Sequence, residues 1–253
     1  MTRSDFSLEG RVAIVIGASR GIGRAIALGY ARAGAQVAVA SRSLPDLERV
    51  ADEIRGLGKP PLSLQADISQ KGDVDLLVEK TVERFGTIDI LVNNPALTIL
   101  VPLMELGEEG WDQIMNTSLK GFYFCCQAAG RVMMGKRRGV IINVASALGL
   151  RASPRMPGYS IAKAGVIMLT RVLAVELGGY NIRVNAIAPG LARTDFSQAL
   201  WGDPEYRAKR EAQIPLGRIA EADDMVGAAV FLASDASAYV NGHTLVVDGG
   251  SMA

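Results

Sequence analysis

The sequence predicts a doubly wound α/β fold, with helices on both faces of one parallel sheet. Short segments rich in Val and Ile alternate with longer segments of helical period along the whole chain. Several of the short segments are apolar throughout, as expected for strands that helices cover on both sides. A turn with three glycines follows the first of them, where such folds bind phosphate groups.

The apolar, β-branched segments define the candidate strands, and segments of helical period define the helices between them. We expect strands at residues 11–16, 36–40, 62–66, 88–93, 140–145, 182–188 and 244–247. We expect one helix to begin near residue 21 and others to span 44–57, 71–85, 108–134, 159–177 and 221–233. Neither a repeat nor a linker interrupts the alternation, so residues 1–253 should form a single domain.

Residues 190–220 are the least regular part of the chain, because Trp201, Gly202, Pro204 and Pro215 interrupt any helical period. Loops of this length in compact domains usually have a function. The apolar side chains in this segment also argue against disorder. We therefore expect residues 190–220 to form a lid over a substrate, with a plain surface excursion as the alternative.

Composition narrows the class of protein. The formal net charge is +1, which does not favour a nucleic-acid partner. Cys125 and Cys126 are adjacent and the chain has one histidine, so we expect no metal site and a reducing compartment. We also expect no membrane span and no signal peptide, which makes the cytoplasm the expected location.

The glycine turn reads Gly17-Ala-Ser19-Arg20-Gly21-Ile22-Gly23. Glycines permit a tight turn and a close backbone approach, and the following helix offers unpaired N–H groups to a pyrophosphate. The spacing differs from the commoner Gly-x-Gly-x-x-Gly, and a plain tight turn is the alternative.

The end of the second strand indicates which dinucleotide binds. It reads Ser41-Arg42, without the carboxylate that accepts the ribose hydroxyls of NAD. Arg20 in the glycine turn could reach the same place, and guanidinium groups match a 2′-phosphate. We therefore expect NADP(H) rather than NAD(H), unless both arginines are simply solvated.

Polar and glycine residues follow the later strands in a fixed order. They are Asp67, Asn93-Asn94, Asn116, Ser146, Tyr159-x-x-x-Lys163, Pro189-Gly190 and Val247-Asp248-Gly249-Gly250. With the glycine turn, this set resembles the short-chain dehydrogenase/reductase family in its compact single-domain form, and in particular members similar to 3-oxoacyl-[acyl-carrier-protein] reductase. The enoyl-reductase branch spaces its Tyr and Lys more widely.

The resemblance implies a Rossmann-type fold and a catalytic set of Asn116, Ser146, Tyr159 and Lys163. Tyr159 would protonate the carbonyl oxygen as hydride arrives, Ser146 would orient that oxygen, and Asn116 would hold a water that relays protons to Lys163. A free tyrosine has a pKa of about 10, and one cation about 4 Å away could supply most of the ~3-unit drop that catalysis near neutral pH requires. Taken singly, each residue also fits an ordinary structural role.

The resemblance also implies the cofactor contacts, with Lys163 on the nicotinamide ribose and Asp67 beside the adenine. The expected contacts are Gly17, Ser19, Arg20, Gly21, Ile22, Gly23, Ser41, Arg42, Asp67, Ile68, Asn94, Tyr159, Lys163, Pro189 and Gly190. Two positions depart from the family pattern: Ile16 replaces the usual Thr, and Pro95-Ala96 replaces Ala-Gly. We expect these changes to alter the cofactor geometry or the pocket shape without abolishing binding.

The expected activity is the NADPH-dependent reduction of a ketone to a secondary alcohol. One alternative is a sugar or polyol dehydrogenase that works oxidatively; another, from a different class, is a cofactor-binding scaffold or sensor without turnover. The resemblance also implies a homotetramer built on helices 108–134 and 159–177.

Two clusters of basic residues bear on the substrate. Arg151, Arg155 and Arg193 could meet an anionic substrate, although solvent exposure is the simpler reading. Residues 136–138, Lys-Arg-Arg, could dock an acidic carrier protein, although a solvated helix end is simpler.

Overall fold

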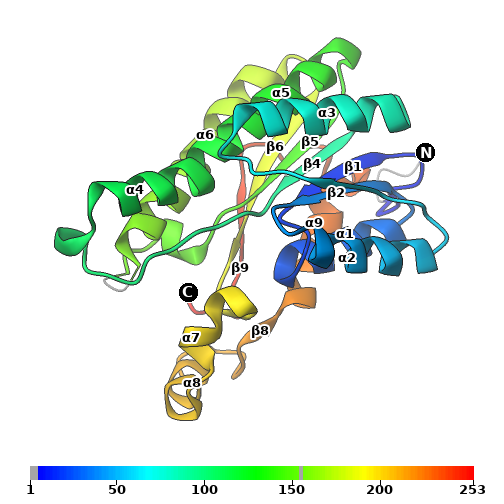
Figure 1. Ribbon diagram of the computed structural model, residues 1–253. Helices are drawn as coiled ribbons and strands as arrows, with labels where there is room; N and C mark the ends of the chain where they lie inside the picture. Colours follow the sequence, from blue (N-terminus) through cyan, green and yellow to red (C-terminus); the bar gives the residue numbers. More distant parts are fainter. Residues whose placement is uncertain (1–4, 154–155) are drawn as a thin grey trace.

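The computed structural model describes residues 5–153 and 156–253, and a parallel sheet runs through its centre (Figure 1). Its strands are β1 (Val12–Ile16), β2 (Gln36–Ser41), β3 (Leu62–Gln65), β4 (Ile90–Asn93), β5 (Gly139–Val144), β6 (Ile182–Pro189) and β9 (Thr244–Val247). They are arranged in the order β3-β2-β1-β4-β5-β6-β9, and every neighbouring pair is parallel. The predicted doubly wound fold is therefore confirmed.

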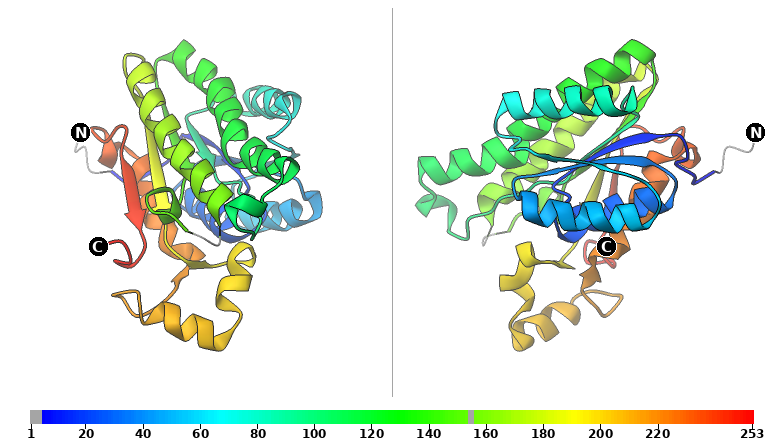
Figure 2. Two further views of the ribbon diagram at one scale, coloured as in Figure 1. Left: turned by 90° about the vertical axis from the view of Figure 1, so that its left-hand side faces the viewer. Right: turned by 45° about the vertical axis from the view of Figure 1, so that its right-hand side comes forward.

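Helices cover both faces of the sheet (Figures 1 and 2), which is why a central strand such as β1 is apolar and buried throughout. One layer consists of α1 (Gly21–Arg32), α2 (Leu44–Gly56) and α9 (Val226–Ala233), and the other of α3 (Lys71–Phe85), α5 (Gly121–Lys136) and α6 (Pro157–Gly178). In β1, Ala13 and Val15 belong to the first core, whereas Ile14 and Ile16 belong to the second.

The strand order reverses at β1. After β1 the chain passes through α1 and returns as β2, which pairs with one side of β1. The strand β4 pairs with the other side of β1. The two connections diverge at the carboxyl ends of these strands and leave a crevice there, where α/β proteins of this kind bind ligands.

The expected helix 108–134 is divided into three parts. It consists of α4 (Glu108–Met115), a π-helical turn η2 (Asn116–Lys120) and α5, and the N–H of Gly121 donates to the carbonyl of Asn116 five residues earlier. A Cβ added at Gly121 would lie 2.6 Å from Ile68, so this turn packs directly on the loop that follows β3. Single π-turns often mark functional sites.

The segment 190–220 contains short elements instead of a plain loop. They are β7 (Ala192–Arg193), η4 (Asp195–Ser197), α7 (Gln198–Trp201) and α8 (Pro204–Glu211). β7 pairs with β8 (Ala220–Glu221), so the expected helix 221–233 begins only after this strand, with the 3₁₀ turn η5 (Ala222–Met225) and α9. Figures 1 and 2 show α7 and α8 apart from the layered body. That this segment is a lid stays a prediction.

The remaining short elements are η1 (Leu103–Glu105), η3 (Ala147–Gly149) and η6 (Asp235–Ser237). Among residues 5–153 and 156–253, every helix is too short or too polar to cross a membrane.

Candidate active site

A cavity of about 670 Å³ opens at the carboxyl ends of the central strands, within the usual size range of cofactor sites. Its walls come from the loops after β1 to β6 and from the segment 190–220. It thus occupies the crevice at the reversal of the strand order.

Most of the residues expected at the site line this one cavity. They are Gly17, Ser19, Arg20, Gly21, Ile22, Ser41, Arg42, Asp67, Ile68, Asn94, Ser146, Tyr159, Lys163, Pro189 and Gly190. Gly23 and Asn116 do not line it.

The glycine turn is shaped to receive a pyrophosphate. Gly17 and Gly21 have φ angles of +75° and +55°, which favour glycine, and the N-terminus of α1 has neither a side-chain cap nor an acidic residue in its first turn. Its backbone N–H groups and the helix dipole can therefore bind an anion. A Cβ at Gly23 would lie 2.1 Å from the Gly17 carbonyl oxygen, so Gly23 permits close packing of the turn.

The departure at Pro95 lies against this turn. A Cβ at Gly17 would be 3.1 Å from the Pro95 nitrogen, and the Asn94 amide donates to the Gly17 carbonyl oxygen at 3.2 Å. The loop after β4 thus holds the glycine turn from the side, and Asn94 ties it down where Ile16 has no hydroxyl to do so.

The ends of β2 and β3 fit the adenosine part of NADP. Arg20, Arg42 and Ser41 line the cavity where β2 ends, in the place expected for a 2′-phosphate. Asp67 lines the same region, and its carboxylate accepts the N–H of Ser69 at 2.9 Å. The residues present therefore fit NADP(H), and Arg20 and Arg42 supply the positive charge that its extra phosphate requires.

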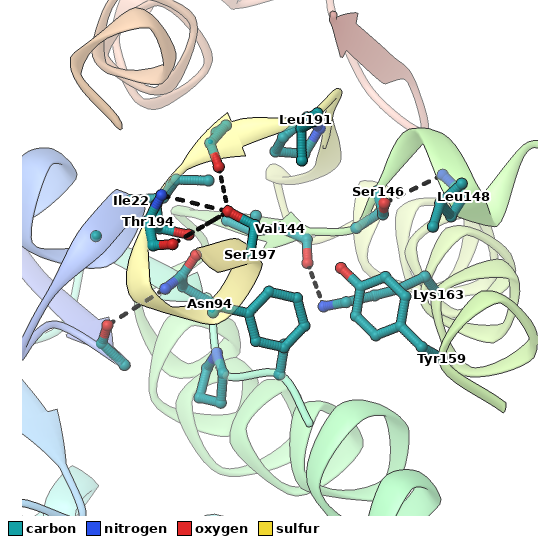
Figure 3. Close-up of a pocket in the computed structure, with 18 of the residues that line it drawn as sticks. Ile22, Asn94, Val144, Ser146, Leu148, Tyr159, Lys163, Leu191, Thr194 and Ser197 are labelled. Atoms are coloured by element: carbon teal, nitrogen blue, oxygen red, sulfur yellow. Dashed lines mark hydrogen bonds between the residues drawn. The ribbon is translucent and has the colours of Figure 1, made fainter. Parts of the chain in front are cut away.

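Ser146, Tyr159 and Lys163 meet at the other end of the cavity (Figure 3). Ser146 follows β5 and its hydroxyl accepts the N–H of Leu148 at 3.1 Å, whereas the other two side chains lie one turn apart on α6. The Lys163 Nζ donates to the Val144 carbonyl oxygen at 2.7 Å and lies 5.7 Å from the centre of the Tyr159 ring. All three residues are buried.

Burial, not the lysine charge, dominates the pKa of Tyr159. It raises this pKa to about 12, and the hydrogen bond with Ser146 offsets only part of the rise. Burial likewise lowers the pKa of Lys163 to about 7. The expected drop in the pKa of Tyr159 is thus wrong for these side chains by themselves, because both charged forms are desolvated and the ammonium is directed at a backbone carbonyl.

Asn116 lies outside the cavity wall, in the π-turn between α4 and α5. Its side-chain oxygen accepts a hydrogen bond from Lys120 at 3.2 Å, and its backbone carbonyl accepts one from Gly121. The neighbouring Thr117 lines the cavity instead. The proposed water relay at Asn116 therefore remains a prediction.

The segment 194–197 contacts both ends of the site, which the sequence analysis did not anticipate. A Cβ at Gly21 would lie 3.1 Å from Thr194, Asp195 lies 3.4 Å from Arg20, and the Phe196 ring centre lies 5.5 Å from that of Tyr159. Thr194 and Ser197 form a reciprocal capping box around this turn. The pattern Thr-x-x-Ser could have indicated the turn, but not what it contacts.

The arginines considered for substrate binding differ from one another. Arg151 lines the cavity, whereas Arg193 lies outside it, pairs with Glu221 and stacks on Trp201. Arg155 lies outside the described residues.

Known proteins match the chain along its whole length. The adh_short_C2 family model, described as Enoyl-(Acyl carrier protein) reductase, matches residues 17–252. The chain is 41% identical over 254 residues to the 2-dehydro-3-deoxy-D-gluconate 5-dehydrogenase of Escherichia coli, covering 100% of both chains. It is 40% identical over 239 residues to the 3-oxoacyl-[acyl-carrier-protein] reductase of Staphylococcus aureus, covering 94% of this chain and 96% of the relative.

A solved structure agrees with these sequence relatives. The gluconate 5-dehydrogenase of Burkholderia cenocepacia, in complex with NADP and tartrate, superposes with a TM-score of 0.94 at 34% identity, covering 99% of this chain and 98% of that one. The motifs, the fold and these matches agree: the chain belongs to the short-chain dehydrogenase/reductase family of oxidoreductases.

Proposed function

We propose that this protein uses NADP(H) to interconvert a ketone and a secondary alcohol. The observation that carries the proposal is one cavity with Ser146, Tyr159 and Lys163 at one end and with the glycine turn, Arg20 and Arg42 at the other. When bound along this cavity, the nicotinamide supplies or accepts the hydride.

The protein side chains supply the proton and hold the substrate. The Ser146 hydroxyl orients the carbonyl oxygen, and the Tyr159 hydroxyl protonates it. Because the pKa of Tyr159 is about 12, its phenol carries its proton at neutral pH, which is the state that reduction needs. The Nζ of Lys163 donates to the Val144 carbonyl oxygen and lies near Tyr159. Its ammonium form stabilises the phenolate that forms.

An oxidative sugar or polyol dehydrogenase is the second candidate, and it uses the same residues in reverse. In that direction Tyr159 acts as a base and must first lose its proton, which its raised pKa opposes. The sequence relatives include both a gluconate-type dehydrogenase and a carrier-protein reductase, so they do not choose between the directions.

Carrier-protein docking at residues 136–138 is not favoured by the geometry. Lys136 pairs with Asp89, and Arg137 donates to the Gly179 carbonyl oxygen at 2.8 Å. These residues precede the first residue of β5, whereas Ser146 follows its last residue, so the cluster lies at the edge of the sheet away from the cavity.

We also propose that the protein works as a cytoplasmic homotetramer. Ile161, Met168, Val172 and Val175 follow a helical period along one exposed side of α6. This is more apolar surface than a helix with one buried face requires. Sedimentation of the purified protein as a monomer would contradict this assembly.

The deciding experiment follows NADPH and NADH absorbance over a panel of ketones, 3-oxoacyl thioesters and ketoses. We expect turnover with NADPH and a loss of about 10³-fold in Tyr159→Phe, which removes only the acidic hydroxyl. NADPH binding, measured by fluorescence, should survive in the variant. Full activity in Tyr159→Phe would refute the mechanism, a preference for NADH would refute the cofactor assignment, and tight NADPH binding without turnover would favour the scaffold alternative.

A further inference from the structure

The charges that line the cavity are distributed unevenly. Towards the nucleotide end, the cations share the wall with Asp46, Asp67 and Asp195, and Asp195 pairs with Arg20. Three cavity arginines, Arg42, Arg151 and Arg210, have no ion-pair partner among the described residues; Arg42 follows β2 at the nucleotide end, whereas the other two do not belong to that end.

Arg151 and Arg210 come from different elements that rest on one support. Arg151 follows η3, five residues after Ser146, and donates to the Ser251 carbonyl oxygen at 3.4 Å. Arg210 belongs to α8, whose following residues reach the same C-terminal strip, because the N–H of Leu216 donates to the Gly249 carbonyl oxygen at 3.1 Å. Residues 249–251 thus contact both segments, and both arginines line the one cavity.

Polar side chains accompany the two arginines. Arg210 donates to Gln213 at 2.9 Å, and Ser153, Gln213 and Ser251 also line the cavity. Arg210 is half-buried and Arg151 is exposed, so both guanidinium groups remain open to an anion in the cavity. The planar fork of a guanidinium matches a carboxylate in two parallel hydrogen bonds, and hydroxyl and amide groups suit the hydroxyls of a polyol.

We infer that Arg210 and Arg151 form a carboxylate-binding subsite, and that the substrate is a small hydroxy or keto acid. This inference rests on the proposed function, since it names the substrate of the same site. The carboxylate is held by the wall at Arg210, and the carbon that reacts lies at Ser146 and Tyr159. Phe196, which packs on Tyr159, bounds the space between them.

The test compares aldonates with the matching alditols, which differ only in the carboxylate. D-gluconate and sorbitol are offered with NADP⁺ to the wild type and to Arg210→Ala, Arg210→Lys and Arg151→Ala. Arg207→Ala is the matched control, because it removes a guanidinium from the same helix without touching the cavity wall. Calorimetric titration of both compounds into the NADP⁺-loaded protein gives a readout that does not depend on turnover.

We expect the wild type to bind and oxidise gluconate in preference to sorbitol. Arg210→Ala should raise the gluconate KM and Kd about 10- to 100-fold with little change in kcat, Arg210→Lys should recover part of the loss, and Arg207→Ala should resemble the wild type. Equal use of both compounds, or unchanged gluconate binding in Arg210→Ala, would overturn the subsite.

Further outcomes of the experiment distinguish a failure of this inference from a failure of the proposed function. Turnover of neutral ketones with NADPH but no binding of gluconate would overturn the subsite and leave the oxidoreductase intact. Tighter binding of glucose 6-phosphate than of gluconate, lost in Arg210→Ala, would replace the carboxylate with a phosphate ester and so overturn the inference. No turnover of any carbonyl, with gluconate still bound through Arg210, would support the subsite and contradict the proposed function.

Discussion

The glycine turn that lines one part of the cavity is built from backbone at the carboxyl end of a central strand, whereas residues 194–214 line the cavity with side chains. The turn follows β1, which is buried throughout, and its glycines leave no room for a side chain. Within residues 194–214, by contrast, the helices α7 and α8 have no buried residue. We therefore expect cofactor binding to depend on the sheet, and residues 194–214 to tolerate changes that leave the sheet undisturbed.

Gly23→Ala tests the glycine turn and should have the largest effect. The new Cβ would lie 2.1 Å from the Gly17 carbonyl oxygen, which is backbone and cannot rotate away. We expect the free energy of unfolding in urea to fall by about 3 kcal/mol, together with weaker NADPH binding. Gly72→Ala on α3 is the control, because nothing lies within 4 Å of its Cβ. If both variants were equally stable, the close-packed turn would not be essential.

Lys163→Met tests the burial of an ionisable group beside Tyr159, through the pH dependence of the free energy of unfolding. The pKa of Lys163 is about 7 in the folded protein, against an ordinary 10.5. Between these pH values the unfolded chain binds more protons, so the wild-type free energy of unfolding should rise with pH across this window, by a few kcal/mol. Lys163→Met lacks this contribution, and urea unfolding from pH 7 to 10 measures the difference. Parallel pH profiles would mean that Lys163 keeps its ordinary pKa.

Asp195→Asn tests the ion pair between residues 194–214 and the glycine turn, and should have the smallest effect. Asp195 and Arg20 are about two-thirds exposed and lie 3.4 Å apart, so the pair contributes little stability. Without the carboxylate, Arg20 is free for the 2′-phosphate, and NADPH should bind about two- to threefold more tightly at low salt while NADH is unaffected. Asp223→Asn, away from the cavity, serves as the control. Weaker NADPH binding in Asp195→Asn would show that Asp195 supports the cofactor site.

Sequence patterns were a good guide to the fold because each strand is short, apolar and followed by a recognisable turn. The expected strands agree with the observed ones to within two residues, for example 88–93 against Ile90–Asn93. The helix 108–134 was less accurately predicted. Its period continues through the π-turn at Asn116, which depends on the approach of Gly121 to Ile68, a residue from another element.

For the candidate site, too, some features were predicted from the sequence and others were not. The resemblance to the short-chain dehydrogenase/reductase family predicted a shared site for Gly17, Ser146, Tyr159 and Lys163, and all four line the cavity. The contacts of Phe196 with Tyr159 and of Asp195 with Arg20 were not predicted. They join positions far apart in the chain, and no local pattern encodes them.

The sequence by itself thus determined the α/β architecture, through its local period, and, through its resemblance to a known family, most of the residues at the cavity. Only the tertiary structure decided how those residues are charged and which others join them. The desolvation that sets the pKa values of Tyr159 and Lys163, and the cavity that both Arg151 and Arg210 line, arise from the packing of distant segments. Burial and the local electric field depend on how distant segments pack against one another, so a sequence pattern cannot predict them.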